Sequence, residues 1–322
     1  MTPLLEITDL DLRFDTEHGG VHAVDRLSLE VHESECIGIV GESGSGKTQT
    51  FLAALGLLAE NGRATGSVRF RGEEILNAPR RRLDQLRGSR LAMIFQDALS
   101  ALTPTMTIGG QLAEPLRRHQ GLSRSAARAR ALEMLETVGL PDAARRLRAY
   151  PFELSGGQRQ RVMIAMALIC RPDLVIADEP TTALDVTVQA QVLRLLDGVK
   201  RHTRTSIVLI THDLAVVAGL CDRVAIMYAG RMVETGSADD IFLRPQHPYT
   251  QGLLRSMPAL GDELERELPA IPGQPPDMRR LPPGCGFQPR CRLAVERCHR
   301  EQPSLARFAP GHRCACHLVP SA

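Results

Sequence analysis

One glycine-rich stretch carries the clearest chemical signal in the sequence, Gly41-Glu42-Ser43-Gly44-Ser45-Gly46-Lys47-Thr48. It follows the apolar run Cys36-Ile37-Gly38-Ile39-Val40 and precedes a helix-like run, so it connects a predicted strand to a predicted helix. Glycines at this spacing let several backbone N–H groups point at one phosphate chain, and the helix N-terminus adds partial positive charge there. Lys47 can reach the β- and γ-phosphates of a nucleotide, and the Thr48 hydroxyl can bind Mg²⁺. We therefore interpret residues 41–48 as a phosphate-binding loop rather than a simple turn.

Polar side chains follow three further apolar runs that are typical of buried strands. Asp178 and Glu179 follow one run, His212 another and Gln96 a third. In α/β folds the carboxyl ends of parallel strands form the ligand-binding edge, so these side chains are candidates for the nucleotide site. We predict that Asp178 and Gln96 contribute to the Mg²⁺ site, that Glu179 polarises an attacking water, and that His212 contacts the γ-phosphate. The alternative is that they are solvent-facing strand ends.

A second anion-binding pattern lies in Leu154-Ser155-Gly156-Gly157-Gln158, directly before a long apolar helix. A serine and two glycines at a helix start can bind an anion through backbone N–H groups. The chain has one phosphate-binding loop, so this second pattern needs another partner. A head-to-tail dimer would let it close on the nucleotide held by the opposing loop.

Strands that alternate with helices must position these groups, which predicts an α/β fold. Alternating apolar residues predict two N-terminal strands within residues 4–32, and residues 68–72 resemble a short hairpin edge. Continuous apolar runs predict buried strands of a parallel sheet at residues 91–95, 174–177, 207–210 and 224–228. From about 105 to 170 the pattern is helical, and Ser123 is the expected cap of a helix that closes at Gly139.

The composition indicates a large α/β domain with an appendage. The 322 residues are 43% hydrophobic, and the formal net charge of +2 argues neither for nor against nucleic acid. No run approaches the roughly 20 apolar residues of a membrane span, and the N-terminus lacks a signal-peptide pattern, so we expect a cytosolic protein. Lys47 and Lys200 are the only lysines, and every other basic residue except histidine is arginine. A lysine at position 47 fits a site in the loop that needs a compact ammonium, which arginine cannot replace. The run Arg80-Arg81-Arg82 is interpreted as a solvated surface.

Prolines and glycines become frequent after residue 258, so we place a boundary at residue 260. Residues 1–260 are predicted to form the nucleotide-binding domain, with a helical subdomain at about 97–170, and residues 261–322 a small irregular C-terminal module. Cys36, Cys170 and Cys221 stand in apolar surroundings and are expected to be buried. The other five cysteines fall within residues 285–316, where a reducing compartment favours metal binding over disulfides.

Taken together in this order, the motifs resemble the nucleotide-binding subunits of ABC transporters over roughly residues 4–260. The matching elements are the Walker A loop, the Q-loop Gln96, the signature at 154–158, the Walker B residues Asp178 and Glu179, the D-loop at 183–185 with Asp185, and the switch His212. The resemblance implies a P-loop ATPase domain with a mixed central sheet, an antiparallel β edge and a helical subdomain. It also implies that Phe14 stacks on adenine, and that ATP lies between Walker A of one subunit and the signature of its partner.

The C-terminal module resembles that of oligopeptide and dipeptide importers. The similar segments are His247-Pro248-Tyr249-Thr250, residues 271–276, residues 284–291 and residues 310–316, and residues 161–167 look like the D-type ATPase subunit. In that group four such cysteines are associated with a [4Fe–4S] cluster, which by motif position are Cys285, Cys291, Cys298 and Cys316. Cys314 is an additional thiol that could replace Cys316. Four thiolates also suit Zn²⁺, although the spacing fits no standard C-x-x-C knuckle, and we favour iron–sulfur with a structural role.

The resemblance implies an ATPase that powers import of di- or oligopeptides from the cytoplasmic face of the inner membrane. Its expected partners are a second, F-type ATPase subunit, two transmembrane permeases and, indirectly, an extracytoplasmic solute-binding protein. Nickel, glutathione or another small solute is the alternative cargo, because solute choice lies in the other subunits. A soluble ATPase acting on nucleic acid or ribosomes is a different class, but such chains usually carry two cassettes or large insertions, and we expect no nucleic-acid partner.

Overall fold

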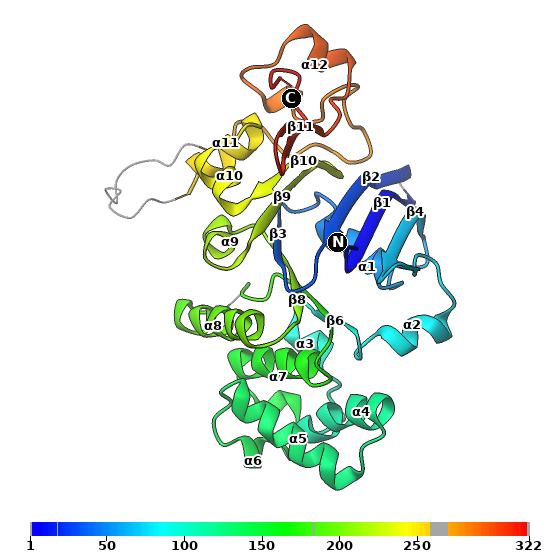
Figure 1. Cartoon of the computed structure of the whole chain (residues 1–322), viewed down its shortest axis with the longest axis vertical. Coiled ribbons are helices and arrows are strands. Elements are labelled where there is room, and N and C mark those ends of the chain that lie inside the picture. Colours follow the sequence, from blue (N-terminus) through cyan, green and yellow to red (C-terminus); the bar gives the residue numbers. More distant parts are fainter. Residues whose placement is uncertain (1, 18, 183, 258–269, 321–322) are drawn as a thin grey trace. The chain divides into compact units, whose positions relative to one another are not determined.

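The computed structural model describes residues 2–17, 19–182, 184–257 and 270–320, which form two compact units (Figure 1). Unit 1 comprises Met1–Val31, Cys36–Asn77 and Ile210–Ala322, and unit 2 comprises His32–Glu35 and Ala78–Leu209. The boundary expected at residue 260 and Ala183 of the expected D-loop lie outside the described residues.

The N-terminal part of unit 1 is an antiparallel sheet, as the alternating pattern predicts. Its strands are β1 (Leu5–Thr16), β2 (Gly19–Val31), β4 (Gly62–Phe70) and β5 (Glu73–Glu74), in the order β2-β1-β4-β5. In the register, Leu5 is opposite Val31 and Phe14 is opposite Val21. Figure 1 shows β2, β1 and β4 side by side in blue and cyan. The prediction of two N-terminal strands is confirmed, and the expected hairpin edge at 68–72 is the end of the longer strand β4 with β5.

Unit 1 also contains five strands in the order β11-β12-β10-β9-β3. They are β3 (Cys36–Val40), β9 (Arg223–Tyr228), β10 (Arg231–Ser237), β11 (Ala306–Ala309) and β12 (His312–Cys314). β3 and β9 are parallel, and the other neighbouring pairs are antiparallel. All five residues of β3 are buried, which is why this strand carries no polar side chain. Ala229 and Gly230, with φ of 49° and 76°, form the turn between β9 and β10.

Unit 2 contains the parallel strands β6 (Leu91–Ile94) and β7 (Leu174–Asp178). The first four residues of β8 (Ser206–Thr211) also belong to unit 2, and the spatial order here is β8-β7-β6. Every residue of β7 and β8 is buried. The runs at 174–177 and 207–210 thus form buried strands as predicted. The strand predicted at 91–95 is shorter, because β6 ends at Ile94 and Phe95 is 38% exposed.

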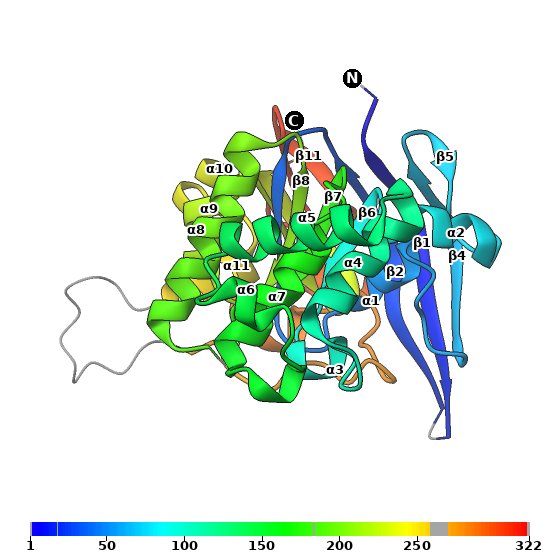
Figure 2. The ribbon, with the colours of Figure 1, turned by 90° about the horizontal axis from the view of Figure 1, so that it is seen from below.

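Residues 98–168 of unit 2 are mostly helical. The helices in this range are α3 (Ala98–Ala101), α4 (Ile108–Gln120), α5 (Arg124–Thr137), α6 (Ala143–Arg146), η1 (Pro151–Glu153) and α7 (Gly156–Leu168). Figure 2 shows α4 to α7 grouped together in green. Their apolar faces meet in one buried cluster that extends from Leu102 to Cys170. Ser123 caps α5 by accepting from the N–H of Ala126, and Gly139 follows with φ of 69°, as predicted.

Several elements have no counterpart in the sequence predictions. They are α2 (Arg80–Leu86) and α8 (Val186–His202) in unit 2, and α10 (Ala238–Leu243), α11 (Pro248–Arg255), η2 (Gln288–Arg290), α12 (Glu296–Arg300), β11 and β12 in unit 1. The helices α1 (Lys47–Ala54) and α9 (Leu214–Leu220) complete unit 1. Among the described residues, no helix has the length and apolar character that a membrane crossing needs.

Candidate functional site

The phosphate-binding loop of unit 1 runs from the end of β3 to the first turn of α1. Gly41 packs so closely that a Cβ there would lie 2.2 Å from the carbonyl oxygen of Met227. Gly46 has φ of 95°, in the left-handed region that favours glycine, and its added Cβ would lie 2.4 Å from the carbonyl oxygen of Ala23. Both glycines are therefore required by the path of the loop between its neighbours.

Lys47 lies inside this loop. Its Nζ donates to the carbonyl oxygens of Gly41 and Glu42 at 2.7 and 2.9 Å, and it lies 3.4 Å from Ser45 Oγ. Lys47 is 5% exposed, so its ammonium is held by the same backbone that would surround a phosphate. Ser45 is also buried, Thr48 is half-buried, and Ser43 and Gly44 are exposed at the tip. The geometry fits a pre-formed anion cradle with one fixed positive charge.

Two other predicted residues belong to unit 1. His212 follows β8 directly and is exposed, and the adjacent Asp213 caps α9 by accepting from the N–H of Ala215 at 2.8 Å. Phe14 lies near the end of β1 and is half-buried, and a Cβ on Gly62 would lie 2.7 Å from its ring. Both side chains are accessible, as contact with a nucleotide requires.

In unit 2 the structure brings Glu179 together with Gln96. The Glu179 carboxylate accepts from Gln96 Nε2 at 3.2 Å and from Thr182 Oγ1 at 2.8 Å. Glu179 has φ of 45°, which is uncommon for a residue with a side chain, whereas the adjacent Asp178 is 4% exposed at the end of β7. The two carboxylates therefore occupy different environments, as a division of roles requires.

The predicted signature is the N-terminus of α7. Ser155 Oγ accepts from the N–H of Gln158 at 3.4 Å, and Gln158 Oε1 accepts from the N–H of Ser155 at 3.1 Å, which makes a capping box. Gly156 is exposed, with nothing near a Cβ placed on it, whereas a Cβ on Gly157 would approach Val188 to 3.1 Å. The helix start is thus exposed at Ser155 and Gly156 and closed by a capping box.

One contact connects the signature helix α7 with the turn that follows Glu179, and Asp185 lies at the start of α8. Gln160, which is 4% exposed, donates to the carbonyl oxygen of Pro180 at 2.7 Å, directly after Glu179. Asp185 caps α8 by accepting from the N–H of Val188 at 3.0 Å. The sequence did not point to Gln160 or Thr182, because a single amide in a helix or a single hydroxyl in a turn gives no pattern of its own.

The C-terminal segment (residues 270–320) contains the five clustered cysteines. Cys298 and Cys314 are buried, and Cys285, Cys291 and Cys316 are half-buried. Burial, together with nearby cysteine thiols, raises the pKa of Cys285 to about 11 and raises the pKa of Cys291 and Cys316. Burial, the Glu234 carboxylate and Cys316 raise the pKa of Cys314 strongly.

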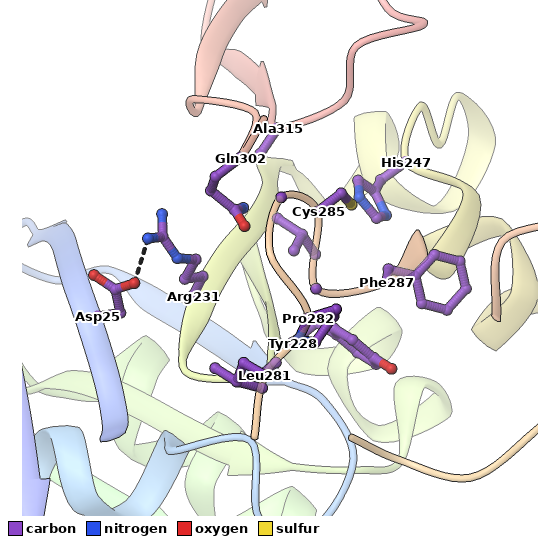
Figure 3. Close-up of a pocket in the computed structure, with 14 residues that line it drawn as sticks. Asp25, Tyr228, Arg231, His247, Leu281, Pro282, Cys285, Phe287, Gln302 and Ala315 are labelled. Carbon is purple, nitrogen blue, oxygen red and sulfur yellow. Dashed lines mark hydrogen bonds and ion pairs between the residues drawn. The ribbon is translucent and has the colours of Figure 1, made fainter. Parts of the chain in front are cut away.

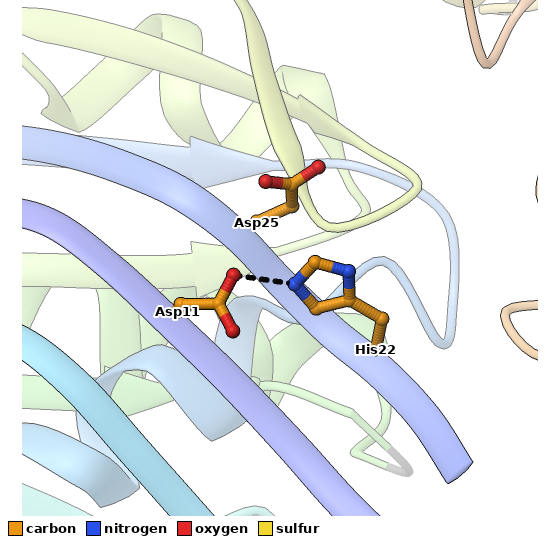
Figure 4. Close-up of side chains that lie close together, drawn as sticks. All are labelled: Asp11, His22 and Asp25. Carbon is orange, nitrogen blue, oxygen red and sulfur yellow. Dashed lines mark hydrogen bonds and ion pairs between the residues drawn. The ribbon is translucent and has the colours of Figure 1, made fainter. Parts of the chain in front are cut away.

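Within the described residues, one group of side chains has metal-ligand spacing, namely Asp11, His22 and Asp25 on β1 and β2 (Figure 4). Their ligand atoms lie within 4.8 Å of one another, and His22 Nε2 is 2.6 Å from Asp11 Oδ2. Both carboxylates also form ion pairs with arginines. Arg13 Nε lies 3.0 Å from Asp11 Oδ1, and Arg231 pairs with Asp25. We assign this group to ion pairing.

Glu42 connects the phosphate-binding loop to the C-terminal segment. Its carboxylate pairs with Arg290, and its backbone N–H donates to Tyr249 Oη at 3.0 Å. Sequence analysis placed Tyr249 and Arg290 in segments typical of the C-terminal module but gave them no role. A pairing across more than two hundred residues has no local signal.

Comparison with known proteins gives the family. The sequence model of the ABC transporter family matches residues 24–182, and that of the "Oligopeptide/dipeptide transporter, C-terminal region" matches residues 233–298. The oligopeptide transport ATP-binding protein OppD of Salmonella typhimurium is 54% identical over 97% of this chain and 93% of its own length. OppD of Haemophilus influenzae is 51% identical over 99% and 98%.

A solved structure agrees with this result. A dimeric ATP-binding cassette in a post-hydrolysis state, bound to ADP and Pi, matches with a TM-score of 0.66 and 27% identity. The match covers 73% of this chain and 98% of that one. The chain therefore belongs to the ATP-binding proteins of the ABC transporter family, in the group that carries the oligopeptide/dipeptide transporter C-terminal region.

Proposed function

We propose that this chain hydrolyses ATP to power the import of di- and oligopeptides through a membrane transporter. One observation carries the proposal: a phosphate-binding loop built around a buried Lys47 occurs in the same chain as a peptide-transporter C-terminal region. The names of the relatives, oligopeptide transport ATP-binding proteins, support peptides as the cargo. Nickel, glutathione or another small solute is the alternative cargo.

In the proposed mechanism, the chain accelerates hydrolysis mainly by positioning ATP and stabilising the charge that develops in the transition state. It forms no covalent bond to the substrate. The loop N–H groups and the Lys47 ammonium hold the β- and γ-phosphates, and Phe14 stacks on adenine. Thr48, Gln96 and Asp178 would hold Mg²⁺, which neutralises phosphate charge when it is bound.

Glu179 is the proposed general base. Its carboxylate is held by Gln96 and Thr182, which orients it for a water that attacks the γ-phosphate. His212 contacts the γ-phosphate and reports its presence. The first role needs a water within hydrogen-bond distance of the Glu179 carboxylate, and the second needs the γ-phosphate within hydrogen-bond distance of the His212 ring.

The second half of the site is proposed to come from a partner ATPase subunit. Ser155, Gly156, Gly157 and Gln158 present an exposed helix start, which suits the phosphates held by an opposing loop. Asp185 lies at the start of the next helix and is proposed to belong to the same dimer interface. Two bound ATP molecules close the dimer, and hydrolysis reopens it.

The proposed assembly contains an F-type ATPase as the second subunit, two permeases and, indirectly, a solute-binding protein. The chain would then lie at the cytoplasmic face of the inner membrane as a peripheral subunit. The test is ATPase activity of the assembled complex in liposomes, with peptide-loaded binding protein on the outside. We expect peptide to stimulate hydrolysis, with nickel and glutathione as parallel arms. Stimulation by DNA or ribosomes, with no response to any solute, would instead support the soluble class.

The cysteines are proposed to hold a [4Fe–4S] cluster. Four thiolates around one Zn²⁺ lie roughly 3.8 Å apart, since the Zn–S distance is about 2.3 Å. Among the described residues, no three cysteine sulfurs lie within 4.8 Å of one another, although their charges affect each other's pKa. A cubane also takes four thiolates, one on each iron, and the proposal rests on this ligand count together with the resemblance of the segment to the peptide-importer group.

Cys316 is the proposed fourth ligand, with Cys285, Cys291 and Cys298. Its pKa is affected by burial and by Cys291 and Cys298, whereas Cys314 faces the buried Glu234 carboxylate, which disfavours a thiolate. The cluster would brace the C-terminal segment.

Iron and acid-labile sulfide analysis of anaerobically purified protein tests this assignment. We expect equal amounts of both, loss of both in Cys316→Ser, and retention in the matched variant Cys314→Ser. Stoichiometric zinc without iron or sulfide would reject the cluster.

A further inference from the structure

The Glu42 side chain contacts a residue far outside the phosphate-binding loop, Arg290. Arg290 forms a two-pronged ion pair with it, with Nη1 to Oε2 at 2.7 Å and Nη2 to Oε1 at 3.0 Å. The Arg290 side chain is 6% exposed and the Glu42 side chain 24%. A bidentate pair with this little exposure fixes both position and charge.

Two backbone contacts hold Glu42 in the same place. Its N–H donates to Tyr249 Oη at 3.0 Å, and its carbonyl oxygen accepts from Lys47 Nζ at 2.9 Å. The first contact comes from α11, and the second from the loop lysine itself. Any change in the Glu42 side chain therefore acts on a residue that also contacts the phosphate-binding ammonium.

The charge of Glu42 opposes the function of the loop. A carboxylate beside a polyphosphate site repels the ligand, and the repulsion is stronger where water is partly excluded. The guanidinium of Arg290 cancels this charge without occupying the loop N–H groups. The ion pair thus converts an unfavourable loop residue into a neutral unit.

The C-terminal segment determines where Arg290 lies. Its Nε donates to the carbonyl oxygen of Pro272 at 2.9 Å, and Nη1 also lies 3.3 Å from Tyr228 Oη. The backbone N–H of Arg290 donates to the carbonyl oxygen of Phe287 at 3.0 Å, which makes the turn η2. The contacts with Pro272 and Tyr228 therefore hold the guanidinium beside Glu42.

Phe287 anchors this turn. It is 4% exposed, and its ring packs edge-on against Tyr228 at 5.2 Å, with Tyr249 at 5.4 Å. Figure 3 shows Tyr228, Phe287 and Cys285 around one cavity of about 190 Å³. The aromatic group thus connects the turn that carries Arg290 to the strand β9 and the helix α11.

We propose that Arg290 is a positioning residue for ATP binding: it neutralises the Glu42 carboxylate, so that the C-terminal segment sets the nucleotide affinity of the phosphate-binding loop. This inference rests on the proposed ATP-binding function. It differs from a purely structural tether, because a tether would act through folding and would be insensitive to the charge of Glu42.

The test is a double-mutant cycle on the full chain, with dissociation constants for ATP, ADP and AMP measured by calorimetry. We expect Arg290→Gln to weaken ATP binding about 10- to 100-fold, because it leaves a partly buried carboxylate unpaired. The loss should shrink from ATP to ADP to AMP as phosphate charge decreases. Adding Glu42→Gln to Arg290→Gln should recover at least about tenfold, because the repelling charge is gone.

Arg279→Gln is the matched control. Arg279 lies in the same C-terminal segment, and its described ion pair is with Asp277 at 2.8 Å, so we expect wild-type affinity. Arg290→Lys, which keeps the charge but loses the two-pronged geometry, should fall between wild type and Arg290→Gln. It also serves as the variant to measure if Arg290→Gln does not fold.

Three outcomes would overturn the inference. They are equal ATP affinity in Arg290→Gln and wild type, an equal loss for all three nucleotides, or a double variant as weak as Arg290→Gln. If the wild-type chain itself bound no ATP, the proposed function would fail rather than this inference alone.

Discussion

Replacement of Glu179 by glutamine tests the proposed catalytic role with little structural change. Both described hydrogen bonds of the carboxylate, from Gln96 and Thr182, end on Oε2. The amide oxygen of glutamine can accept both of them. Glutamate and glutamine also share the cost of the backbone φ of 45°, so the substitution does not change strain. We therefore expect the free energy of unfolding to stay within about 0.5 kcal/mol.

The effect on turnover should be much larger. An amide cannot take a proton from the attacking water, and loss of a general base costs typically about 10²- to 10⁴-fold. At roughly 1.4 kcal/mol per factor of ten, this is about 3–5 kcal/mol of transition-state stabilisation. ATP affinity should stay close to that of wild type, because Glu179 acts on the water.

Phosphate release at saturating ATP in the assembled transporter measures turnover, and calorimetry measures ATP binding. Glu136→Gln, at an exposed position on α5, is the matched control for the same chemical change. Turnover of Glu179→Gln within a factor of two of wild type would refute the role of general base. Parallel losses of binding and turnover would point instead to an altered fold.

Three further predictions concern stability. Gly41→Ala places a Cβ 2.2 Å from a backbone oxygen, so we expect it to cost about 1–3 kcal/mol of unfolding free energy in urea titrations, and an unchanged midpoint would contradict the packing. Gly198→Ala should have the opposite sign, raising stability by about 0.5–1 kcal/mol in the same assay, because the position is helical with open space around it. Burial opposes ionisation of Asp11, but hydrogen bonds with Arg13 and His22 lower its pKa below the ordinary value of 3.8. Its contribution is therefore present above pH 3.8 and is lost as pH falls through the lower folded value, so the stability difference between wild type and Asp11→Asn should shrink from pH 5 to pH 3.

Local patterns in the sequence predicted the parts of the fold that depend on neighbouring residues. The phosphate-binding loop and the buried strand β7 could be identified because a motif or apolar run is contiguous. The cap at Ser123 follows from chemistry within three residues. In contrast, α8 was not predicted, although it is the longest of the described helices.

The contacts that connect distant segments could not be predicted from local patterns. The Glu42–Arg290 pair joins residues 248 positions apart, and either residue alone resembles an ordinary surface charge. Gln160 contacts the turn after Glu179 only because α7 packs beside it. Thr182 lies three residues from Glu179, but a lone hydroxyl in a turn gives no signal of this contact. Such pairings depend on how elements pack, which a single sequence does not encode locally.

The short strand β12 has a consequence for how the chain is made. It lies against β10, with Cys314 opposite Glu234, and β11 lies beyond it. During synthesis this edge of β10 therefore stays unpaired until residues 312–314 have been made. An open sheet edge invites pairing with other chains. Products that stop before residue 306 should consequently aggregate even though they contain every nucleotide-binding motif, because β12 and β11 no longer cover this edge.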